Sequence, residues 1–229
     1  MNLDDLSRKL GVEIEPQLLE LALTHRSYAY EHGGIPNNER LEFLGDSVLG
    51  FVVTAHIHDH FPDLAEGDLT KIKNAVVSAK ALAAVAEPLG IGDFMRLGKG
   101  EEQTGGRSKA NLLADTFEAL LGAAYVSKGL DAASGIIQRL VFPLLSDREA
   151  LLENSDPKTK LQEFAQQQNT GEVRYDTRFE GPDHERLFFT SVFIGEDLIA
   201  EGAGRSRKSS ETDAAIVALR SIAQKGHQS

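Results

Sequence analysis

The sequence predicts a two-domain protein in which an all-α domain is followed by a smaller α+β domain. Apolar residues recur at helical spacing through residues 1–148, whereas beyond residue 170 they alternate as expected of strands. A polar stretch lies between the two patterns and ends in Asp156-Pro157, a favourable start for a helix. We therefore expect domains at residues 1–148 and 156–226, joined by a linker at residues 149–155.

Five helices are expected in the first domain. Their 3.6-residue apolar patterns cover Pro16–Leu23, Asn38–His60, Asp68–Glu87, Lys109–Ser127 and Asp131–Leu145. Asn38 and Asp68 are residue types that cap helix N-termini, and Gly90 and Gly129 fall where helices should end. Residues 97–108 are rich in glycine and charge, so we expect a connecting loop there.

The second domain is expected to follow the order α-β-β-β-α. Its helices and strands are predicted at Lys158–Gln168, Glu172–Phe179, Leu187–Gly195, Leu198–Gly202 and Ser209–Gln224. The first strand shows the two-residue alternation clearly, because Val173, Tyr175, Thr177 and Phe179 share one face. About 70 residues in this order make a small, separate α+β unit.

The segment Asn38–Gly50, NERLEFLGDSVLG, places three acids on one face of its helix. At roughly 100° per residue, Glu39, Glu42 and Asp46 lie within about 60° of one another. Apolar residues as far as Phe51 occupy much of the remaining circumference, so this helix is expected to be buried on most sides. Converging carboxylates are costly without a positive partner, and Mg²⁺ prefers carboxylate oxygens and water. Taken alone, the segment is equally compatible with a solvated acidic stripe.

A second apolar helix makes the metal interpretation stronger. Asn111–Val126 is even more hydrophobic than the first segment, and it carries Asp115 and Glu118 at positions i and i+3. A plain solvated face is less compatible with so apolar a helix. Two such helices, packed together, would bring their acidic pairs into one carboxylate cluster for a divalent cation.

The composition excludes several classes of protein. The chain has no cysteine, which excludes disulfides and thiolate metal sites and fits a reducing cytoplasm. Its longest apolar runs are too short to cross a bilayer, and the acidic start does not resemble a secretory signal. The net charge is −11, with −8 over residues 1–150 and −3 over residues 151–229. Any binding to nucleic acid would therefore depend on local basic clusters. Arg107 and Lys109 are candidates for phosphate contact, and a solvated loop is the alternative.

Several segments resemble known families. NERLEFLGDSVLG is similar to the signature motif of the bacterial ribonuclease III family, and LADTFEALLGAAY (residues 113–125) is similar to its second catalytic helix. LTHRSYAYE (residues 23–31) and EGDLTK (residues 66–71) resemble two further blocks in the right order. DPKTKLQE, GPDHERLF and GAGRSRKSSETDAA, which begin at residues 156, 181 and 202, resemble a double-stranded-RNA-binding domain.

The resemblance implies an endoribonuclease that hydrolyses phosphodiester bonds in double-stranded RNA, with Mg²⁺ as cofactor, Mn²⁺ as a substitute and no nucleotide cofactor. The products would carry 5′-phosphates, 3′-hydroxyls and short 3′ overhangs, and the substrates would be ribosomal RNA precursors and structured transcripts. The implied metal ligands are Glu42, Asp46, Asp115 and Glu118. The implied catalytic acids are Glu39, Asp46, Glu66 and Glu118. Such metal-assisted hydrolysis needs no nucleophilic side chain.

The resemblance also implies partners. The family forms a homodimer, in which Phe43 would enter a pocket of the second subunit; packing within its own core is the alternative. The implied RNA-binding residues are Gln162, Gln166, His184, Arg205, Arg207 and Lys208. Where the family often has a third basic residue this chain has Ser209, followed by Ser210, a departure that bears on the strength of phosphate binding.

Other interpretations of the sequence are weaker. A duplex-RNA-binding protein that keeps the nuclease domain only as a dimer scaffold would not need the six acids. A hydrolase of small nucleotides would leave the second domain without a role. His56, His58 and His60 resemble a zinc-hydrolase motif, but they are one residue short of it and do not share one helical face. His25 is expected to be a hydrogen-bonded structural residue rather than a general base.

Overall fold

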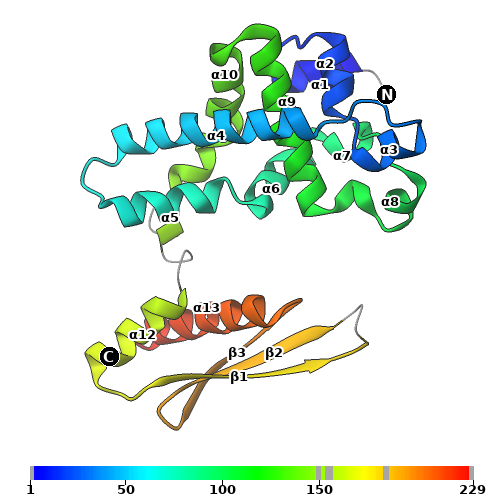
Figure 1. Ribbon diagram of the computed structural model, residues 1–229. Helices are drawn as coiled ribbons and strands as arrows, with labels where there is room; N and C mark the ends of the chain where they lie inside the picture. Colours follow the sequence, from blue (N-terminus) through cyan, green and yellow to red (C-terminus); the bar gives the residue numbers. More distant parts are fainter. Residues whose placement is uncertain (1–2, 148–150, 153–156, 183–185, 227–229) are drawn as a thin grey trace. The chain divides into compact units, whose positions relative to one another are not determined.

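The computed structural model describes residues 3–147, 151–152, 157–182 and 186–226. The chain divides into two compact units, residues 1–148 and 149–229 (Figure 1). The expected linker, residues 149–155, falls mostly outside the described residues. Within the described part of the chain, no helix is both long and apolar enough to span a membrane.

The N-terminal unit is built from helices, which confirms the predicted all-α class. Its α-helices are α1 (Leu3–Leu10), α2 (Pro16–Ala22), α3 (Arg26–Glu31), α4 (Glu39–His60), α5 (Glu66–Val76), α6 (Ala79–Leu89), α7 (Ile91–Phe94), α8 (Lys99–Gln103), α9 (Ala110–Lys128) and α10 (Leu130–Leu140). Two 3₁₀ turns, η1 (Gly106–Ser108) and η2 (Phe142–Ser146), complete the unit. Helix α9 contributes fully buried side chains to the core of this unit, including Phe117, the largest of them, and Leu120 and Leu121.

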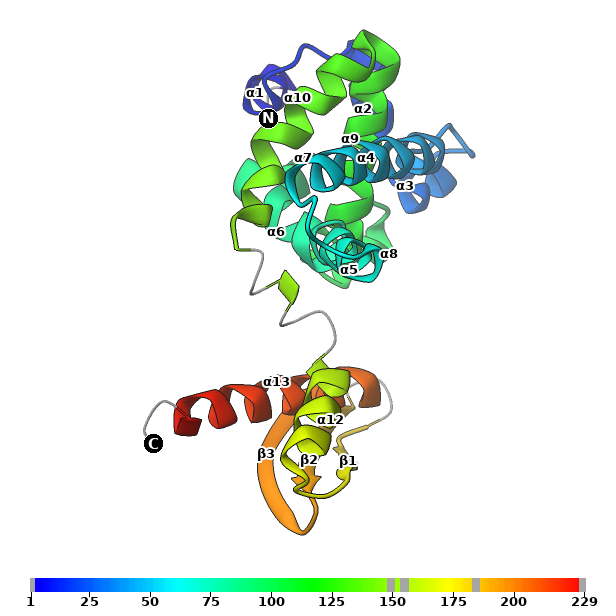
Figure 2. The ribbon, with the colours of Figure 1, turned by 90° about the vertical axis from the view of Figure 1, so that its left-hand side faces the viewer.

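Helices α4 and α9 cross in close contact (Figures 1 and 2). A Cβ at Gly45 would overlap the carbonyl of Glu118, and a Cβ at Gly122 would overlap the carbonyl of Leu41. Glycine therefore permits a backbone-to-backbone approach here that no other residue would allow. At Gly50, in the same helix, a Cβ would meet nothing closer than Cε of Lys73, 3.9 Å away, so no such approach occurs there.

One predicted helix is in fact two. The segment expected as a single helix, Asp68–Glu87, contains α5 and α6, which are separated at Val77 and Ser78. The Ser78 side chain accepts a hydrogen bond from the backbone N–H of Ala81 at 3.3 Å, and this cap starts α6. Asp68 lies in the first turn of α5 and is not its N-cap. The expected stop at Gly90 is confirmed, since Gly90 is left-handed with a φ of 69°.

The expected loop at residues 97–108 contains the short helix α8, and its cations have internal partners. Arg107 pairs with Glu102 and donates to the carbonyl of Gly92 at 2.7 Å. Lys109 pairs with Glu101. Both cations are engaged within this part of the chain, and their availability to phosphate stays a prediction.

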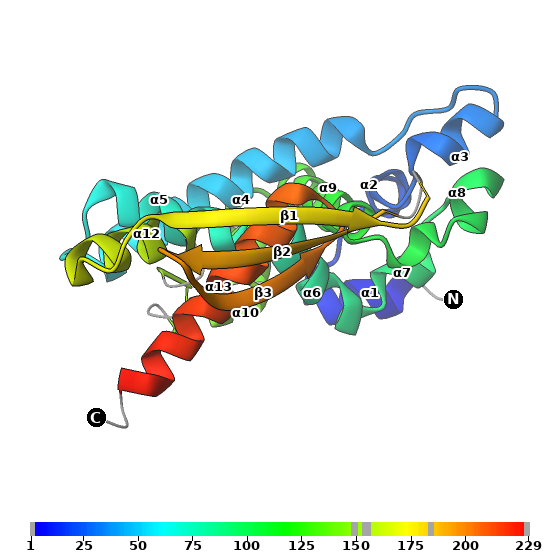
Figure 3. The ribbon, with the colours of Figure 1, turned by 90° about the horizontal axis from the view of Figure 1, so that it is seen from below.

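The C-terminal unit has the predicted α-β-β-β-α order, which confirms the α+β class. Its elements are α12 (Pro157–Gln168), β1 (Val173–Glu180), β2 (Leu187–Ile194), β3 (Asp197–Gly204) and α13 (Arg207–Gly226). The strands form an antiparallel sheet in the order β1-β2-β3, and α13 crosses behind it in Figure 3. The core lies between the sheet and the helices, where Leu161, Val192 and Ala218 are fully buried.

Candidate active site and nucleic-acid interface

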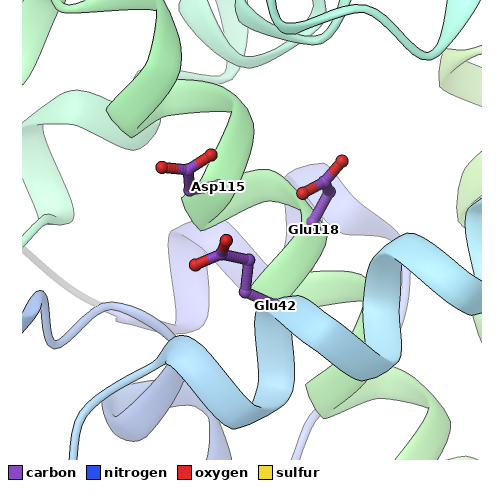
Figure 4. A group of neighbouring side chains, drawn as sticks. All are labelled: Glu42, Asp115 and Glu118. Carbon is purple, nitrogen blue, oxygen red and sulfur yellow. The ribbon is translucent and has the colours of Figure 1, made fainter.

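Three of the predicted metal ligands meet where α4 crosses α9. Glu42 extends from α4, and Asp115 and Glu118 extend from α9 (Figure 4). One carboxylate oxygen from each lies within 4.8 Å of the other two. Gly45 lies three residues after Glu42 and packs on the Glu118 carbonyl, so the glycine contact is what brings the two acidic pairs together.

The cluster has a large electrostatic cost. Burial raises the pKa of the Glu118 carboxyl to about 8, and the negative charges of Asp46, Asp115 and Glu42 contribute to the rise. Burial also raises the pKa of Glu42, together with the charges of Asp115 and Glu39. The pKa of Asp115 is raised by burial against the opposing influence of His25 and Arg26. The acids therefore disfavour one another's ionised forms.

The donor set fits a divalent cation. Among the described residues, no protein N–H or O–H donates a hydrogen bond to the carboxylates of Glu42, Asp115 or Glu118. Their oxygens are half-buried, close together and of the type that hard cations bind. A cation at this position would offset both the burial of these charges and the repulsion that the neighbouring acids exert on Glu42 and Glu118.

The other predicted acids lie around this cluster or apart from it. Asp46 is exposed one turn further along α4, where its charge acts on Glu118, but its oxygens do not join the 4.8 Å group. Glu39 is exposed at the start of α4 and influences Glu42. Glu66 begins α5 and accepts a hydrogen bond from the Thr70 hydroxyl at 2.9 Å. Glu66 is not part of the acidic cluster that the described residues form.

The structure adds residues that the motif analysis missed. Arg26, in α3, lies 3.7 Å from Glu39 through its Nη1, and its charge lowers the pKa of both Glu42 and Asp115. Asn37 donates to Glu39 at 3.1 Å. His25 accepts a hydrogen bond from the backbone N–H of Ser27 at 3.2 Å and caps α3, which confirms its structural role. Arg26 was present in the sequence as part of the family-like segment THRSY, but that segment does not show which acids it would face.

The histidines at the end of α4 do not form a zinc site. The rings of His56 and His60 lie tilted against each other with centroids 3.8 Å apart, and His56 stacks on Phe142. The His58 ring contacts its neighbour Asp59, at 2.9 Å. In the described ranges, the group of side chains able to hold a metal ion is the acidic cluster.

One side of α4 carries exposed aromatic residues. Phe43 is 77% exposed and Phe51 is 63% exposed. The expectation that apolar residues bury this helix on most sides is therefore wrong at both positions. Phe43 does not pack in the core of its own unit. Since large exposed apolar side chains on a folded domain commonly mark contact surfaces, this side of α4 is a candidate interface.

The C-terminal unit exposes most of its predicted RNA-binding residues. Gln162 and Gln166 lie one turn apart on α12, and both are exposed. Arg205, Arg207 and Lys208 are exposed at the entry of α13. His184 lies outside the described residues.

The two serines that depart from the family pattern have structural roles. Ser206 accepts from the backbone N–H of Ser209 at 3.1 Å, and Ser209 accepts from the N–H of Ser206 at 3.0 Å, a reciprocal cap for α13. Ser210 is fully buried and its hydroxyl lies 2.7 Å from that of Thr190 in β2. Both serines thus fix the start of the helix to itself and to the sheet.

Glu211 holds two cations at the same end of α13. Lys158 Nζ lies 2.6 Å from one carboxylate oxygen, and Arg207 Nε lies 2.9 Å from the other. The hydrogen bond from Lys158 lowers the pKa of Glu211, and the bond from Arg207 lowers it further, against the opposing effect of burial. Arg207 is therefore partly engaged within the unit.

Comparisons with known proteins match both units. Residues 15–145 match the family described as ribonuclease-III-like, and residues 157–222 match the double-stranded RNA binding motif. A protein named Ribonuclease 3 from Leifsonia xyli subsp. xyli is 51% identical over 213 residues, which cover 93% of this chain and 90% of the relative. Another of the same name, from Thermobifida fusca, is 50% identical over 218 residues, covering 95% and 91%.

A solved structure also matches the N-terminal unit. The nuclease domain of ribonuclease III from Campylobacter jejuni aligns with a TM-score of 0.58 and 40% identity, over 62% of this chain and 97% of that one. The structure is described as showing flexibility in a region involved in dimer formation.

Proposed function

The chain belongs to the ribonuclease III family of double-stranded-RNA endoribonucleases, and we propose that Glu42, Asp115 and Glu118 form its metal centre. The observation that carries this proposal is the convergence of three half-buried carboxylates whose oxygens lie within 4.8 Å of one another. We propose Mg²⁺ as the ion, with Mn²⁺ as a substitute, and we retain Glu39, Asp46 and Glu66 as further acids of the cleavage site.

The chemistry assigned to the protein is positioning and charge control. When bound, the cation would activate water and stabilise charge on the phosphoryl oxygens. Glu42, Asp115 and Glu118 would hold that cation on two helices locked by Gly45 and Gly122, so little reorganisation is needed. Asp46, one turn from Glu42, adds a further carboxylate at the exposed edge. The products would be short duplexes with 5′-phosphates and 3′-hydroxyls.

We propose a homodimer formed through the exposed side of α4. Phe43 is 77% exposed, as a side chain that enters a partner's pocket should be in the isolated subunit. Two cleavage centres would then face one RNA duplex and cut both strands, leaving short 3′ overhangs. The dimer region described for the Campylobacter jejuni nuclease domain supports an interface in this unit.

We assign RNA binding in the C-terminal unit to Gln162, Gln166, Arg205, Arg207 and Lys208, with His184 as a sequence prediction. A-form RNA offers 2′-hydroxyls in its minor groove and phosphates across the major groove, which amide and basic side chains recognise. The helix N-terminus at Arg207 adds a favourable dipole for phosphate. The cytoplasmic location, the ribosomal RNA substrates and the boundaries of the linker stay predictions from the sequence.

The test is cleavage of a long, perfect RNA duplex in Mg²⁺ and in EDTA, followed by analysis of the product ends. We expect short duplexes with 5′-phosphates in Mg²⁺ and none in EDTA. Glu118→Ala should abolish cleavage and keep RNA binding, whereas Glu87→Ala, at an exposed acid on α6, should change neither. Cleavage by Glu118→Ala at the parent rate would contradict the metal assignment. RNA binding without cleavage by the parent would favour the dimer-scaffold alternative.

A further inference from the structure

A groove of about 600 Å³ opens between α3, the loop that follows it and α8. Its lining includes His25, Arg26, Tyr30, Ile35, Asn37 and Glu101. Arg26 lies 3.7 Å from Glu39, which shares the first turn of α4 with Glu42, so this groove lies near the acidic cluster. The groove therefore offers a cation, an amide and two exposed apolar side chains next to the proposed cleavage centre.

Arg26 is held only loosely. Its side chain is 72% exposed, and its Nη1 lies 3.7 Å from a carboxylate oxygen of Glu39, which is itself 54% exposed. An exposed ion pair of this kind contributes little to stability, because water screens both charges. A phosphate can replace the carboxylate at little cost, because a guanidinium binds phosphate through two parallel hydrogen bonds.

Neighbouring cations differ from Arg26 in this respect. Arg96 pairs with Glu20 and donates to the Tyr28 hydroxyl at 3.0 Å, and Arg107 donates to a backbone carbonyl as well as to Glu102. These side chains fix neighbouring segments of the fold. Of the lysine and arginine side chains in the described part of the chain, Arg26 is the one that lines this groove.

The backbone beneath Arg26 is fixed although its side chain is not. The Ser27 hydroxyl accepts a hydrogen bond from the backbone N–H of Gly98 at 2.9 Å, and Glu31 accepts one from the N–H of Lys99 at 2.8 Å. Helix α3 is thus tied at both ends to the segment that begins α8. An exposed, weakly paired guanidinium on a fixed backbone can change partners without moving the groove.

We propose that this groove is a subsite for the sugar–phosphate backbone of the cleaved strand, in which Arg26 leaves Glu39 and binds a phosphate next to the scissile one. Tyr30, 87% exposed, and Ile35 would cover the attached ribose, and the Asn37 Nδ2, which donates to Glu39, would turn to a 2′-hydroxyl while its Oδ1 keeps the Glu39 N–H. Glu39 is then a positioning residue, which holds both side chains at the groove while RNA is absent. This proposal rests on the proposed function of the acidic cluster.

The test is steady-state cleavage of a short RNA duplex by the full-length protein, with KM measured across a salt series. Arg26→Ala should raise KM roughly tenfold, the value of one charged hydrogen-bonded contact, and leave kcat within about twofold. RNA binding is measured in the Glu118→Gln background in Mg²⁺, where no cleavage occurs. There Arg26→Ala should reduce the slope of log Kd against log salt by about the amount that one phosphate contact contributes. Arg26→Lys should keep the slope.

Two variants make the result specific. Arg8→Ala is the matched control, because Arg8 is also an exposed arginine, 75% exposed and paired with Asp5 at 3.1 Å, but it lies on α1. It should leave KM and the salt slope unchanged. Tyr30→Ala should raise KM by a smaller factor, roughly threefold, and leave the salt slope unchanged because the side chain is neutral.

The proposal would be overturned if Arg26→Ala left both KM and the salt slope at the parent values. It would also be overturned if Arg26→Ala lowered kcat and raised the Mg²⁺ concentration for half-maximal rate, since Arg26 would then act on the metal centre. Failure of the proposed function would look different: the parent and Arg8→Ala would themselves fail to cleave, or would cleave in EDTA. Thermal unfolding checks folding, and if Arg26→Ala fails to fold, Arg26→Lys and Tyr30→Ala decide between the outcomes.

Discussion

Glu118 and Glu211 are two partly buried glutamates in opposite electrostatic environments. Glu118 is surrounded by Asp46, Asp115 and Glu42, and burial is the main cause that raises its pKa to about 8. Glu211 accepts hydrogen bonds from Lys158 and Arg207, which lower its pKa. The first carboxyl lies among like charges, whereas the second has two cations of its own chain beside it.

The difference separates a functional carboxylate from a structural one. A partly buried acid that two cations of its own chain already compensate does not need a ligand, and removing one partner is what destabilises it. An acid kept among other acids costs stability until something positive arrives from outside. In this molecule the acids that lie among other acids are found where α4 crosses α9. The acid that its own chain compensates, Glu211, lies at the start of α13.

The largest expected effect comes from comparing two variants, each of which replaces one of these glutamates with glutamine. Glu118→Gln should lower kcat for duplex cleavage at least about a thousandfold, because a neutral amide cannot replace the carboxylate in the proposed metal centre. Glu211→Gln should leave kcat within about twofold of the parent, since Glu211 belongs to the C-terminal unit and is not among the acids of the proposed metal centre. Single-turnover cleavage with excess enzyme measures both. A comparable loss in the two variants would contradict the distinction drawn between them.

The next effect tests the geometry that keeps the acids together. Gly45→Ala places a methyl group on the Glu118 carbonyl, so α4 and α9 must separate, and we expect a loss of about 3 kcal/mol in unfolding free energy together with loss of cleavage. Gly135→Ala is the matched control, because nothing lies within 4 Å of a Cβ at that position in α10. It should be neutral or stabilising by up to about 1 kcal/mol. Urea unfolding of both variants checks this.

Local spacing made the acidic pairs and most helices predictable from the sequence. Glu42 and Asp46, and likewise Asp115 and Glu118, share a helical face because they are three or four residues apart, a property of one helix alone. The C-terminal order α-β-β-β-α was predictable for the same reason, since alternation and helical periodicity are local patterns.

The parts that could not be predicted depend on contacts between distant segments. Nothing local indicates that Gly122 meets Leu41, or that Arg26 reaches Glu39 across a turn of chain. The exposure of Phe51 was missed because an apolar residue on an apolar helix is indistinguishable from core by periodicity. The break at Ser78 was missed because apolar residues continue on both sides of it.

A smaller effect is expected at the C-terminal unit. Glu211→Gln removes the charge that pairs with Lys158 and Arg207, and since the Glu211 side chain is only 13% exposed, we expect a loss of about 2 kcal/mol in the stability of this unit. Hydrogen exchange read by mass spectrometry should show faster exchange in peptides of α12 and α13 at pH 7. Peptides of α9 should be unchanged, and faster exchange there would show that the two units do not respond separately.

The smallest effect is the opposite pH dependence of the two glutamates in EDTA. Because the folded pKa of Glu118 is raised to about 8, the unfolded state releases this proton first as pH rises, and the N-terminal unit should lose about 1 kcal/mol between pH 5 and 8. The lowered pKa of Glu211 has the opposite sign, so its stabilisation is present at neutral pH and is lost as pH falls below about 4.5. Glu118→Gln should flatten the first dependence in α9 peptides and leave the second, in α13 peptides, unchanged. If the α9 slope persisted in Glu118→Gln, the titrating group would be another member of the cluster, and the contrast with Glu211 would belong to the cluster as a whole.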